Sequence, residues 1–146
     1  MQTNEQLLDL LENYLAQREL PTEPERLYDP IRYSLAGGGK RLRPMLLLLS
    51  CGLFADDVDV ALPAAAAVEI FHNFTLLHDH IMDNAAERRG KPSVYARWGG
   101  NVAILSGDAM LISAYRLLAQ APPALLPRIL EVFNTMALGV CEGQQY

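Results

Sequence analysis

The chain has 146 residues, of which 51% are hydrophobic, and a formal net charge of −5 at pH 7. This length suits one domain with a sizeable core, and the hydrophobic content excludes an intrinsically disordered chain. The acidic balance argues against a general nucleic-acid binder, because affinity for a phosphate backbone needs a basic surface. The two cysteines, Cys51 and Cys141, lie far apart without metal-type spacing, so we expect buried thiols in a reducing compartment.

The sequence shows no obvious segment for export or membrane insertion. The first twelve residues, MQTNEQLLDLLE, have neither a basic n-region nor an apolar h-region. The longest apolar run, residues 45–55, is well short of the roughly 20 residues that span a bilayer. We therefore expect a cytoplasmic chain without a membrane span.

The hydrophobic spacing predicts three helices in the first part of the chain. The first helix has the i, i+3, i+4, i+7 pattern of an amphipathic helix, with Thr3 or Asn4 as its N-cap. A second helix runs from about residue 25 to residue 35 and ends at the glycine triplet at residues 37–39. A third begins at Arg43, with Pro44 in its first turn. The residues that carry the first pattern are Leu7, Leu8, Leu11, Tyr14 and Leu15.

Three further helices are expected in the rest of the chain. A long helix begins near Val58 and continues to Asp79 and Asp83, and residues 88–93 form a loop because they contain Gly90 and Pro92. The segment 101–120 is apolar on nearly every side, so this helix must be covered all round. A last helix begins near residue 124. Strand-type alternation appears nowhere, and the predicted fold class is all-α.

The segment LLHDHIMDNAAERR, residues 76–89, concentrates the side chains that carry chemistry. At 3.6 residues per turn, Asp79 and Asp83 fall on one helix face about 6 Å apart. Two carboxylates at this spacing repel each other, and Mg²⁺, which prefers carboxylate and phosphate oxygens, would relieve the repulsion. Taken alone, such a pair is more often a solvated helix face than a metal site.

Two arginines, Arg88 and Arg89, follow the expected end of this helix. An Arg-Arg pair is usually a surface charge run. The planar guanidinium group, however, presents five N–H donors that suit the oxygens of a phosphate or diphosphate. Carboxylates that hold a metal beside arginines that hold phosphate predict a phosphorylated substrate.

A second basic segment, GGGKRLRP, covers residues 37–44. Glycine allows backbone N–H groups to approach an anion, and Lys40, Arg41 and Arg43 bring three cations within about one turn. The alternative is a helix C-cap followed by a solvated basic turn. Because the helix dipole disfavours cations in a first turn, the segment indicates a bound anion.

His72 lies on the same predicted helix as the carboxylates, one turn after Glu69. It shares a stripe with Leu76, Asp79 and Asp83 and lies about 10 Å from Asp79 along the helix. A lone histidine on an apolar helix is more often a hydrogen-bonded core residue than a ligand contact. The shared stripe favours a contact with the ligand.

In this order and at this spacing, GGGKRLRP, EIFH and LLHDHIMDNAAERRGKP resemble the N-terminal half of a trans-polyprenyl diphosphate synthase. This is the family of farnesyl and geranylgeranyl diphosphate synthases. The later segments SGDAML and GVCEGQQY resemble two more of its motifs, so the resemblance covers residues 37–144. It implies an all-α antiparallel helical bundle of the isoprenoid synthase type around a central cavity, assembled as a homodimer.

The resemblance also implies roles for single residues. Asp79 and Asp83 would hold Mg²⁺ against an allylic diphosphate, with Arg88 beside it, and these three would act in catalysis. The implied reaction is a prenyl transfer, in which isopentenyl diphosphate attacks the allylic cation and a short-chain polyprenyl diphosphate forms. The residues that would bind isopentenyl diphosphate are Lys40, Arg43, His72 and Arg89.

The expected length of the product depends on the helix upstream of Asp79. Phe71, Phe74 and Thr75 share a second stripe, and Phe74 lies about 7 Å deeper along the helix than Asp79. In the family, an aromatic residue at this position forms the floor of the product cavity. We therefore expect short products.

Two features depart from the family pattern. The first aspartate-rich motif of the family is D-D-x-x-D, whereas His80 occupies its second position here. His80 lies about 100° around the helix from Asp79, so we expect Mg²⁺ binding to be retained but weaker. The chain also stops before the second aspartate-rich motif, inside a helical pattern. We expect residues 1–146 to form the N-terminal portion of one synthase domain, without full activity alone.

Two other interpretations remain open from the sequence. His72, His78, Asp79 and Asp83 superficially resemble the ligand set of a metal-dependent phosphohydrolase, in which the GGGKRLRP segment would have no role. The chain would otherwise be a noncatalytic helical partner or regulatory module of a full-length synthase. His80 and the missing second motif favour this last interpretation.

Overall fold

A computed structural model of the chain describes residues 2–146. These residues form seven α-helices, one 3₁₀ turn and a two-stranded hairpin, which confirms the all-α prediction. The helices are α1 (Asn4–Ala16), α2 (Glu25–Ala36), α3 (Leu42–Gly52), α4 (Leu62–Met82), α5 (Val94–Trp98), α6 (Gly100–Leu118) and α7 (Leu126–Gln145). The turn η1 is Asp59–Ala61, and the strands are β1 (Glu87–Arg88) and β2 (Lys91–Pro92).

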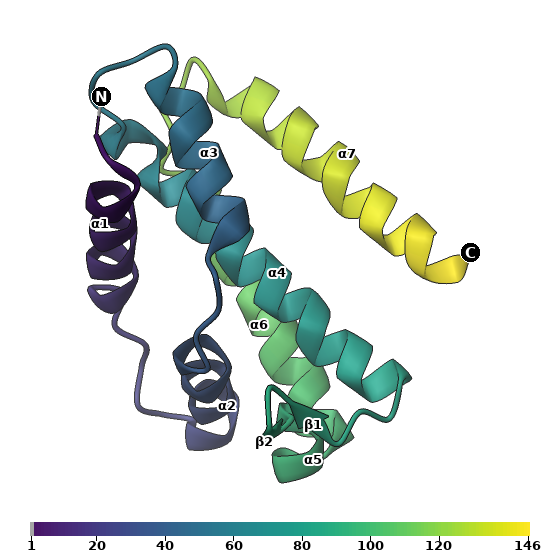
Figure 1. Ribbon diagram of the computed structural model, residues 1–146. Coiled ribbons are helices and arrows are strands. Elements are labelled where there is room, and N and C mark those ends of the chain that lie inside the picture. The colour runs from purple at the N-terminus through teal and green to yellow at the C-terminus, as the bar shows by residue number, and fades with distance from the viewer. Residues whose placement is uncertain (1) are drawn as a thin grey trace.

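The two long helices α4 and α6 pack against each other and form the centre of the molecule (Figure 1). Helices α1 and α3 cover one end of α4, while α2, α5 and the hairpin gather around the other end. Helix α7 extends away from this bundle and packs against it mainly through Phe133. The arrangement leaves the middle and the C-terminal end of α4 facing the hairpin, where the predicted site residues lie.

Close packing between α4 and α6 depends on Gly107. A Cβ atom at this position would lie 2.5 Å from Nε2 of His78 and 3.5 Å from Cδ1 of Phe74. The His78 ring has little room to move, because its Nε2 lies 3.2 Å from the carbonyl oxygen of Ile104 and its face packs against Phe74. Glycine is therefore required here by the approach of the two helices, although it lowers intrinsic helix stability.

Most helix boundaries agree with the expectations within a few residues. Thr3 is the N-cap of α1, and its side chain forms a capping box with Gln6. Helix α4, by contrast, begins at Leu62 rather than near Val58, because η1 intervenes and Pro63 occupies the first turn.

The expectation of no strands was wrong for the loop after α4. Arg88 pairs with Lys91 in an antiparallel hairpin, and the residues between them, Arg89 and Gly90, have φ angles of 53° and 76°. Two consecutive positive φ angles are the requirement of a tight type I′ hairpin turn. Strands of two residues each are too short to show an alternating pattern in the sequence.

The segment Asp59–Met82 is long and apolar enough to cross a membrane by length and composition alone. It is not evident as one apolar run in the sequence, because Glu69, His72 and Asn73 interrupt it. Half of its most apolar window is buried within the protein, as in the core helix of a globular domain.

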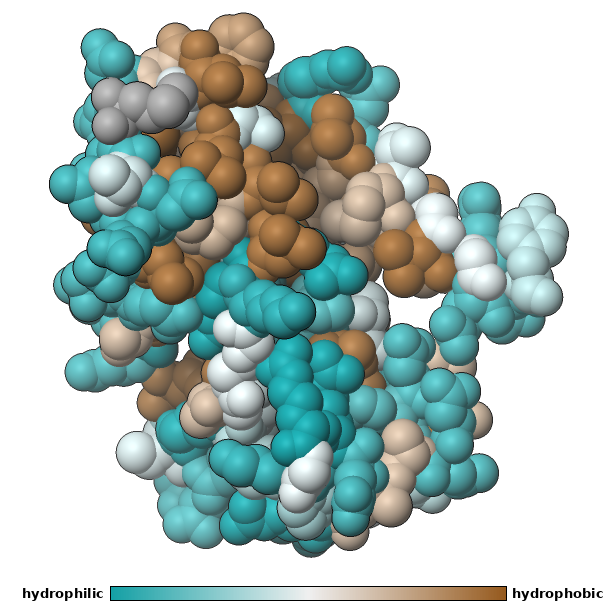
Figure 2. All heavy atoms as spheres, viewed as in Figure 1, coloured by the Kyte–Doolittle hydropathy of each residue, from teal (hydrophilic) through white to brown (hydrophobic). Residues whose placement is uncertain are grey.

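Residues 2–146 of the single chain do not cover α6 all round. Leu105 and Ile112 on its outer face are 60% and 63% exposed. Apolar side chains also gather on the surface over α3 and α7 (Figure 2), including Leu46 and Leu138. Both thiols are free, but neither is fully buried as expected, since Cys51 is half-buried and Cys141 on α7 is exposed.

We predict that Gly107→Ala destabilises the protein, by about 1–3 kcal/mol, because the added methyl group overpacks the α4–α6 contact. Gly139→Ala on α7 is the matched control, since nothing lies within 4 Å of a Cβ there. That change should stabilise by up to about 1 kcal/mol through helix propensity. Urea denaturation measures both, and equal shifts in the same direction would contradict this account of Gly107.

Candidate active site

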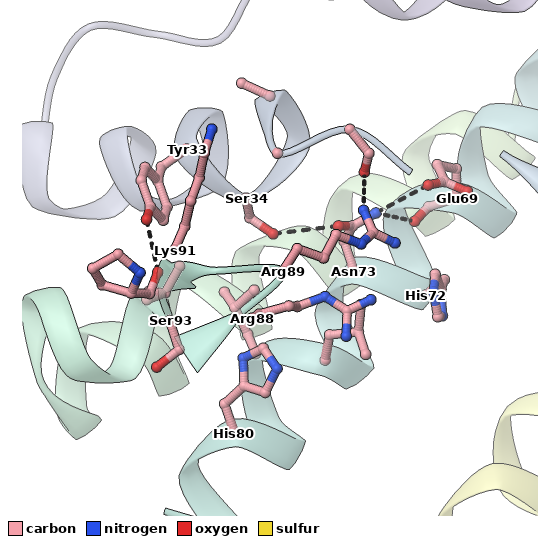
Figure 3. Close-up of a pocket in the computed structure, with 17 residues that line it drawn as sticks. Tyr33, Ser34, Glu69, His72, Asn73, His80, Arg88, Arg89, Lys91 and Ser93 are labelled. Carbon is pink, nitrogen blue, oxygen red and sulfur yellow. Dashed lines mark hydrogen bonds between the residues drawn. The ribbon is translucent and has the colours of Figure 1, made fainter. Parts of the chain in front are cut away.

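A cavity of about 170 Å³ lies between the C-terminal end of α2, the middle of α4 and the β1–β2 hairpin. Its wall carries Arg88, Arg89 and Lys91 from the hairpin, and His72 and His80 from α4 (Figure 3). Cationic and imidazole side chains that converge on one small space suit an anionic ligand.

The hairpin fixes the direction of its basic side chains. Arg88 and Lys91 are directly opposed partners in the antiparallel pair, so both side chains lie on one face of the hairpin. The hydroxyl group of Tyr33 on α2 donates a hydrogen bond of 2.7 Å to the carbonyl oxygen of Pro92 and ties the hairpin to the bundle. The arginines are therefore held against the cavity by backbone structure.

The two basic segments predicted from the sequence meet at this cavity. Nη1 of Arg89 donates a 2.6 Å hydrogen bond to the carbonyl oxygen of Gly38, 51 positions earlier in the chain. Gly39 has a φ angle of 144°, and a Cβ atom there would lie 3.0 Å from the Arg89 guanidinium. The glycines thus allow Arg89 to approach the loop closely, a role that the sequence did not reveal.

Arg41 is a structural residue. It is 8% exposed and occupies the left-handed region as the N-cap of α3. Its Nη1 donates to Oε1 of Glu69 and its Nε to Oε1 of Glu12, each at 2.9 Å. Burial lowers the pKa of Arg41, but the hydrogen bonds that Arg41 donates to Glu12 and Glu69 outweigh burial and raise the pKa above its ordinary value. Arg41 is thus already paired with two carboxylates.

Polar contacts continue from this ion pair into the cavity wall. Nδ2 of Asn73 donates to the backbone oxygen of Glu69 at 2.9 Å and to its Oε1 at 3.3 Å. The Ser34 hydroxyl on α2 donates to Oδ1 of Asn73 at 3.4 Å. The network joins α1, α3, α4 and α2 around one end of the cavity. In the sequence, Asn73 has no signal beyond a polar side chain one turn after Glu69 on an apolar helix.

The four residues expected to bind one diphosphate lie close to each other but not on one wall. His72 and Arg89 line the cavity, while Arg43 lies outside it with its Nη1 at 3.4 Å from Nε2 of His72. Lys40 is exposed in the adjacent loop. Burial, followed by the charge of Arg43, lowers the pKa of His72. Both effects favour the neutral form of the ring, beside the charges of Arg43, Arg88 and Arg89.

His80 lies on the cavity wall beside Arg88. Its Nδ1 atom is buried and has no hydrogen-bond partner in residues 2–146. Burial, followed by the charge of Arg88, lowers the pKa of His80. Burial and then Arg89 lower the pKa of Arg88 in turn. The sequence placed His80 away from the metal face, and the structure adds that it faces the cavity.

The carboxylates Asp79 and Asp83 lie one turn apart at the end of α4, where the backbone N–H of Asp83 donates to the oxygen of Asp79 at 2.8 Å. Asp79 is half-buried, Asp83 is exposed, and neither lines the cavity or forms an ion pair within the described residues. Mg²⁺ is commonly held by one or two carboxylates together with substrate phosphates. This donor pair therefore fits Mg²⁺ that arrives with a diphosphate.

The predicted ligand set of a phosphohydrolase does not assemble. His78 points to α6, where its Nε2 lies 3.6 Å from Oδ1 of Asp108, whereas His72 faces the cavity. Among residues 2–146, no three His, Cys, Asp or Glu side chains gather as they would around a metal ion. That interpretation of the sequence is therefore wrong for the described chain.

The residues expected to set product length lie in an aromatic cluster apart from the arginines. Phe71 is buried, with its ring centroid 5.5 Å from that of Phe74 and 5.2 Å from that of Phe133 on α7. Tyr115 on α6 packs against the other side of Phe133 at 5.3 Å. Thr75 donates its hydroxyl to the carbonyl oxygen of His72, one turn before it. This cluster fills the space between α4, α6 and α7.

Comparison with known proteins gives a consistent result. A family model described as Polyprenyl synthetase matches residues 24–146. The geranylgeranyl diphosphate synthase of Methanosarcina mazei is 42% identical over 125 residues, which cover 84% of this chain and 39% of that protein. The short chain isoprenyl diphosphate synthase of Methanocaldococcus jannaschii is 42% identical over 121 residues, covering 82% of this chain and 37% of that protein.

Solved structures extend this similarity to the fold. A crystal structure of geranylgeranyl pyrophosphate synthase is 49% identical with a TM-score of 0.95, over 99% of this chain and 44% of that one. The geranylgeranyl pyrophosphate synthetase of Geoglobus acetivorans is 39% identical with a TM-score of 0.81, over 97% of this chain and 44% of that one. The chain thus spans about 40% of the length of these relatives, and the predicted isoprenoid synthase fold is confirmed.

We predict that Arg41→Met lowers the free energy of unfolding by about 3–5 kcal/mol, because it leaves the buried Glu69 carboxylate without its partner. Glu12→Gln is the control, and it should cost at most about 1 kcal/mol since the Glu12 side chain is 46% exposed. The double variant Arg41→Met/Glu69→Gln should recover most of the loss. Equal effects of Arg41→Met and Glu12→Gln in urea denaturation would show that Glu69 does not depend on Arg41.

Proposed function

The chain belongs to the polyprenyl synthetase family, and from this premise we propose that it provides the substrate-binding half of a prenyltransferase. The proposed reaction joins isopentenyl diphosphate to an allylic diphosphate and makes a short-chain polyprenyl diphosphate. The observation that carries the proposal is the Arg89–Gly38 hydrogen bond, which brings the two basic segments together at one cavity. Identity of 42% to two isoprenyl diphosphate synthases supports it.

In this proposal, the cavity receives the diphosphate of isopentenyl diphosphate. Arg89 and His72, which line the cavity, contact the diphosphate, and Arg43, whose Nη1 lies 3.4 Å from Nε2 of His72, adds a cation beside them. Lys40 adds a mobile charge from the adjacent loop. Guanidinium groups held by backbone structure lose little freedom when they bind, which favours affinity.

The allylic diphosphate is proposed to lie beside Asp79 and Asp83, with Arg88 next to it. When bound there, Mg²⁺ would neutralise charge on the departing diphosphate. The C–O bond of the allylic substrate breaks, and the diphosphate leaves with the electron pair. The double bond of isopentenyl diphosphate attacks the allylic carbon, and the released diphosphate accepts the proton that is then lost. Apolar residues of α4 and α6 keep water from the cation.

Assembly and location are further parts of the proposal. The exposed side chains of Leu105 and Ile112 on α6 support a homodimer, because a large apolar patch is uncommon on the surface of a monomer. We propose a cytoplasmic enzyme. A noncatalytic partner of a longer synthase is the second candidate, since His80 replaces an aspartate of the family motif.

We predict that Asp79→Ala lowers the Mg²⁺-dependent affinity for an allylic diphosphate at least about tenfold, or ~1.4 kcal/mol, because it removes a metal ligand. Isothermal titration calorimetry with and without Mg²⁺ measures this. Asp9→Ala, which removes an exposed carboxylate of α1, is the control and should change nothing. Mg²⁺-dependent binding that survives Asp79→Ala would refute the metal site, and a wild-type chain that binds neither substrate would refute the proposed function.

We predict that Phe74→Ala lengthens the product in a complete synthase that carries residues 1–146. The truncation opens the aromatic cluster beneath the growing chain, while Phe71 and Phe133 still limit the new space. Mass spectrometry of the extracted products gives the length. Tyr14→Ala, an aromatic truncation outside this cluster, is the control. An unchanged product distribution in Phe74→Ala would contradict the role of Phe74 as the floor.

A further inference from the structure

The carboxylates Asp79 and Asp83 lie at the end of α4 that is least favourable for them. The helix dipole makes this end negative, so cations stabilise it and carboxylates destabilise it. Two like charges one turn apart also repel each other. Asp83 is the C-cap residue, with a φ angle of −95° and a ψ angle of 1°, and lies outside the regular part of the helix. The position of its carboxylate therefore depends on how the chain closes the helix.

Helix α4 closes with a complete Schellman motif. The backbone N–H of Asn84 donates to the carbonyl oxygen of Ile81 at 3.3 Å, and that of Ala85 donates to the carbonyl oxygen of His80 at 2.8 Å. Asn84 is the left-handed residue of the motif, with a φ angle of 50°. Glycine is the usual residue here because it adopts this conformation without steric cost. The backbone alone therefore does not account for a side chain at position 84.

The side chain of Asn84 connects the end of α4 to α5. Its Oδ1 atom accepts a 3.1 Å hydrogen bond from the hydroxyl group of Tyr95. The Tyr95 ring is half-buried against the core, and a Cβ atom on Gly100 at the start of α6 would lie 3.6 Å from its Cε1 atom. Helix α5 itself packs against α4 and α6 (Figure 1). Tyr95 is therefore a donor held by the bundle, and its acceptor is an exposed residue next to Asp83.

From these contacts we propose that Tyr95 is a positioning residue, which acts through Asn84 and holds Asp83 in place to share a metal ion with Asp79. The inference rests on the proposed function, because it takes Asp79 and Asp83 as the ligands of Mg²⁺. The dipole and the carboxylate repulsion both favour opening of the last turn, and the hydrogen bond from Tyr95 opposes it. Without this bond, both carboxylates could bind Mg²⁺ only after the turn had closed again, which lowers the affinity.

The test is isothermal titration of the 146-residue chain with dimethylallyl diphosphate in Mg²⁺ and, separately, with isopentenyl diphosphate in EDTA. We expect Tyr95→Phe to weaken the first interaction about three- to tenfold, the effect of one hydrogen bond, and to leave the second unchanged. Asn84→Gly suits the left-handed φ angle but removes the acceptor, so it should also weaken the first interaction. The double variant Tyr95→Phe/Asn84→Gly should bind no more weakly than the weaker single variant.

Tyr14→Phe is the matched control. It removes a hydroxyl group from another half-buried tyrosine, whose hydroxyl lies 3.4 Å from Oε1 of Gln120. Tyr14 belongs to α1, which covers the opposite end of α4 from α5. This variant should bind both diphosphates as the wild type does.

A second measurement needs no metal. Amide hydrogen exchange of the metal-free chain should be faster over residues 81–86 in Tyr95→Phe than in the wild type, because the turn opens more often. Exchange over the same residues in Tyr14→Phe should match the wild type. Asn84→Gly is the second variant if Tyr95→Phe does not fold, as judged by circular dichroism.

Several outcomes would overturn the inference. It fails if Tyr95→Phe binds dimethylallyl diphosphate in Mg²⁺ as tightly as the wild type, weakens both interactions equally, or leaves exchange over residues 81–86 unchanged. It also fails if the effects of Tyr95→Phe and Asn84→Gly add, because the two residues would then act separately. Wild-type binding that survives Asp79→Ala would refute the proposed metal site itself, whereas binding that needs Asp79 but ignores Tyr95→Phe refutes only the inference.

Discussion

The buried ion pair between Arg41 and Glu69 is the contact on which the cavity depends. It joins the start of α3 to the middle of α4, and through Glu12 and Asn73 it reaches α1 and α2. A buried carboxylate without a partner lowers the stability of the fold, so the packing around the cavity cannot be kept if Arg41 or Glu69 alone is lost. The pair also neutralises Glu69, the one acid on the cavity wall, and leaves that wall positive.

Backbone conformation fixes one arginine in each of the two basic segments. Arg41 and Arg89 both have left-handed φ angles, which are uncommon for residues other than glycine. Arg89 lines the cavity, and Arg41 contacts Glu69 on the cavity wall. Such conformations persist where the surrounding structure determines them, often at functional sites. The glycine loop meets Arg89 closely, and Tyr33 holds the hairpin. A rigid cation cluster can bind an anion with little loss of conformational freedom.

Sequence patterns predicted the helices, and they singled out His72, Arg88 and Arg89, which line the cavity, because long amphipathic periods and clustered charges are local signals. They did not separate Arg41 from Lys40 and Arg43, since three adjacent cations look alike until packing buries one of them beside Glu69. The hairpin left no periodic signal because each strand has two residues. The orientation of His80 depends on how α4 meets the hairpin, which only tertiary structure shows.

The central claim is that two distant basic segments form one diphosphate site. Amide hydrogen exchange followed by mass spectrometry, with and without saturating isopentenyl diphosphate, tests it most directly because it reports each segment separately. The account predicts slower exchange in residues 37–41 and 87–93 together, with the same dependence on ligand concentration, and no change in α7, which lies apart from the cavity. Slower exchange in one of these segments alone, or in neither, would contradict it.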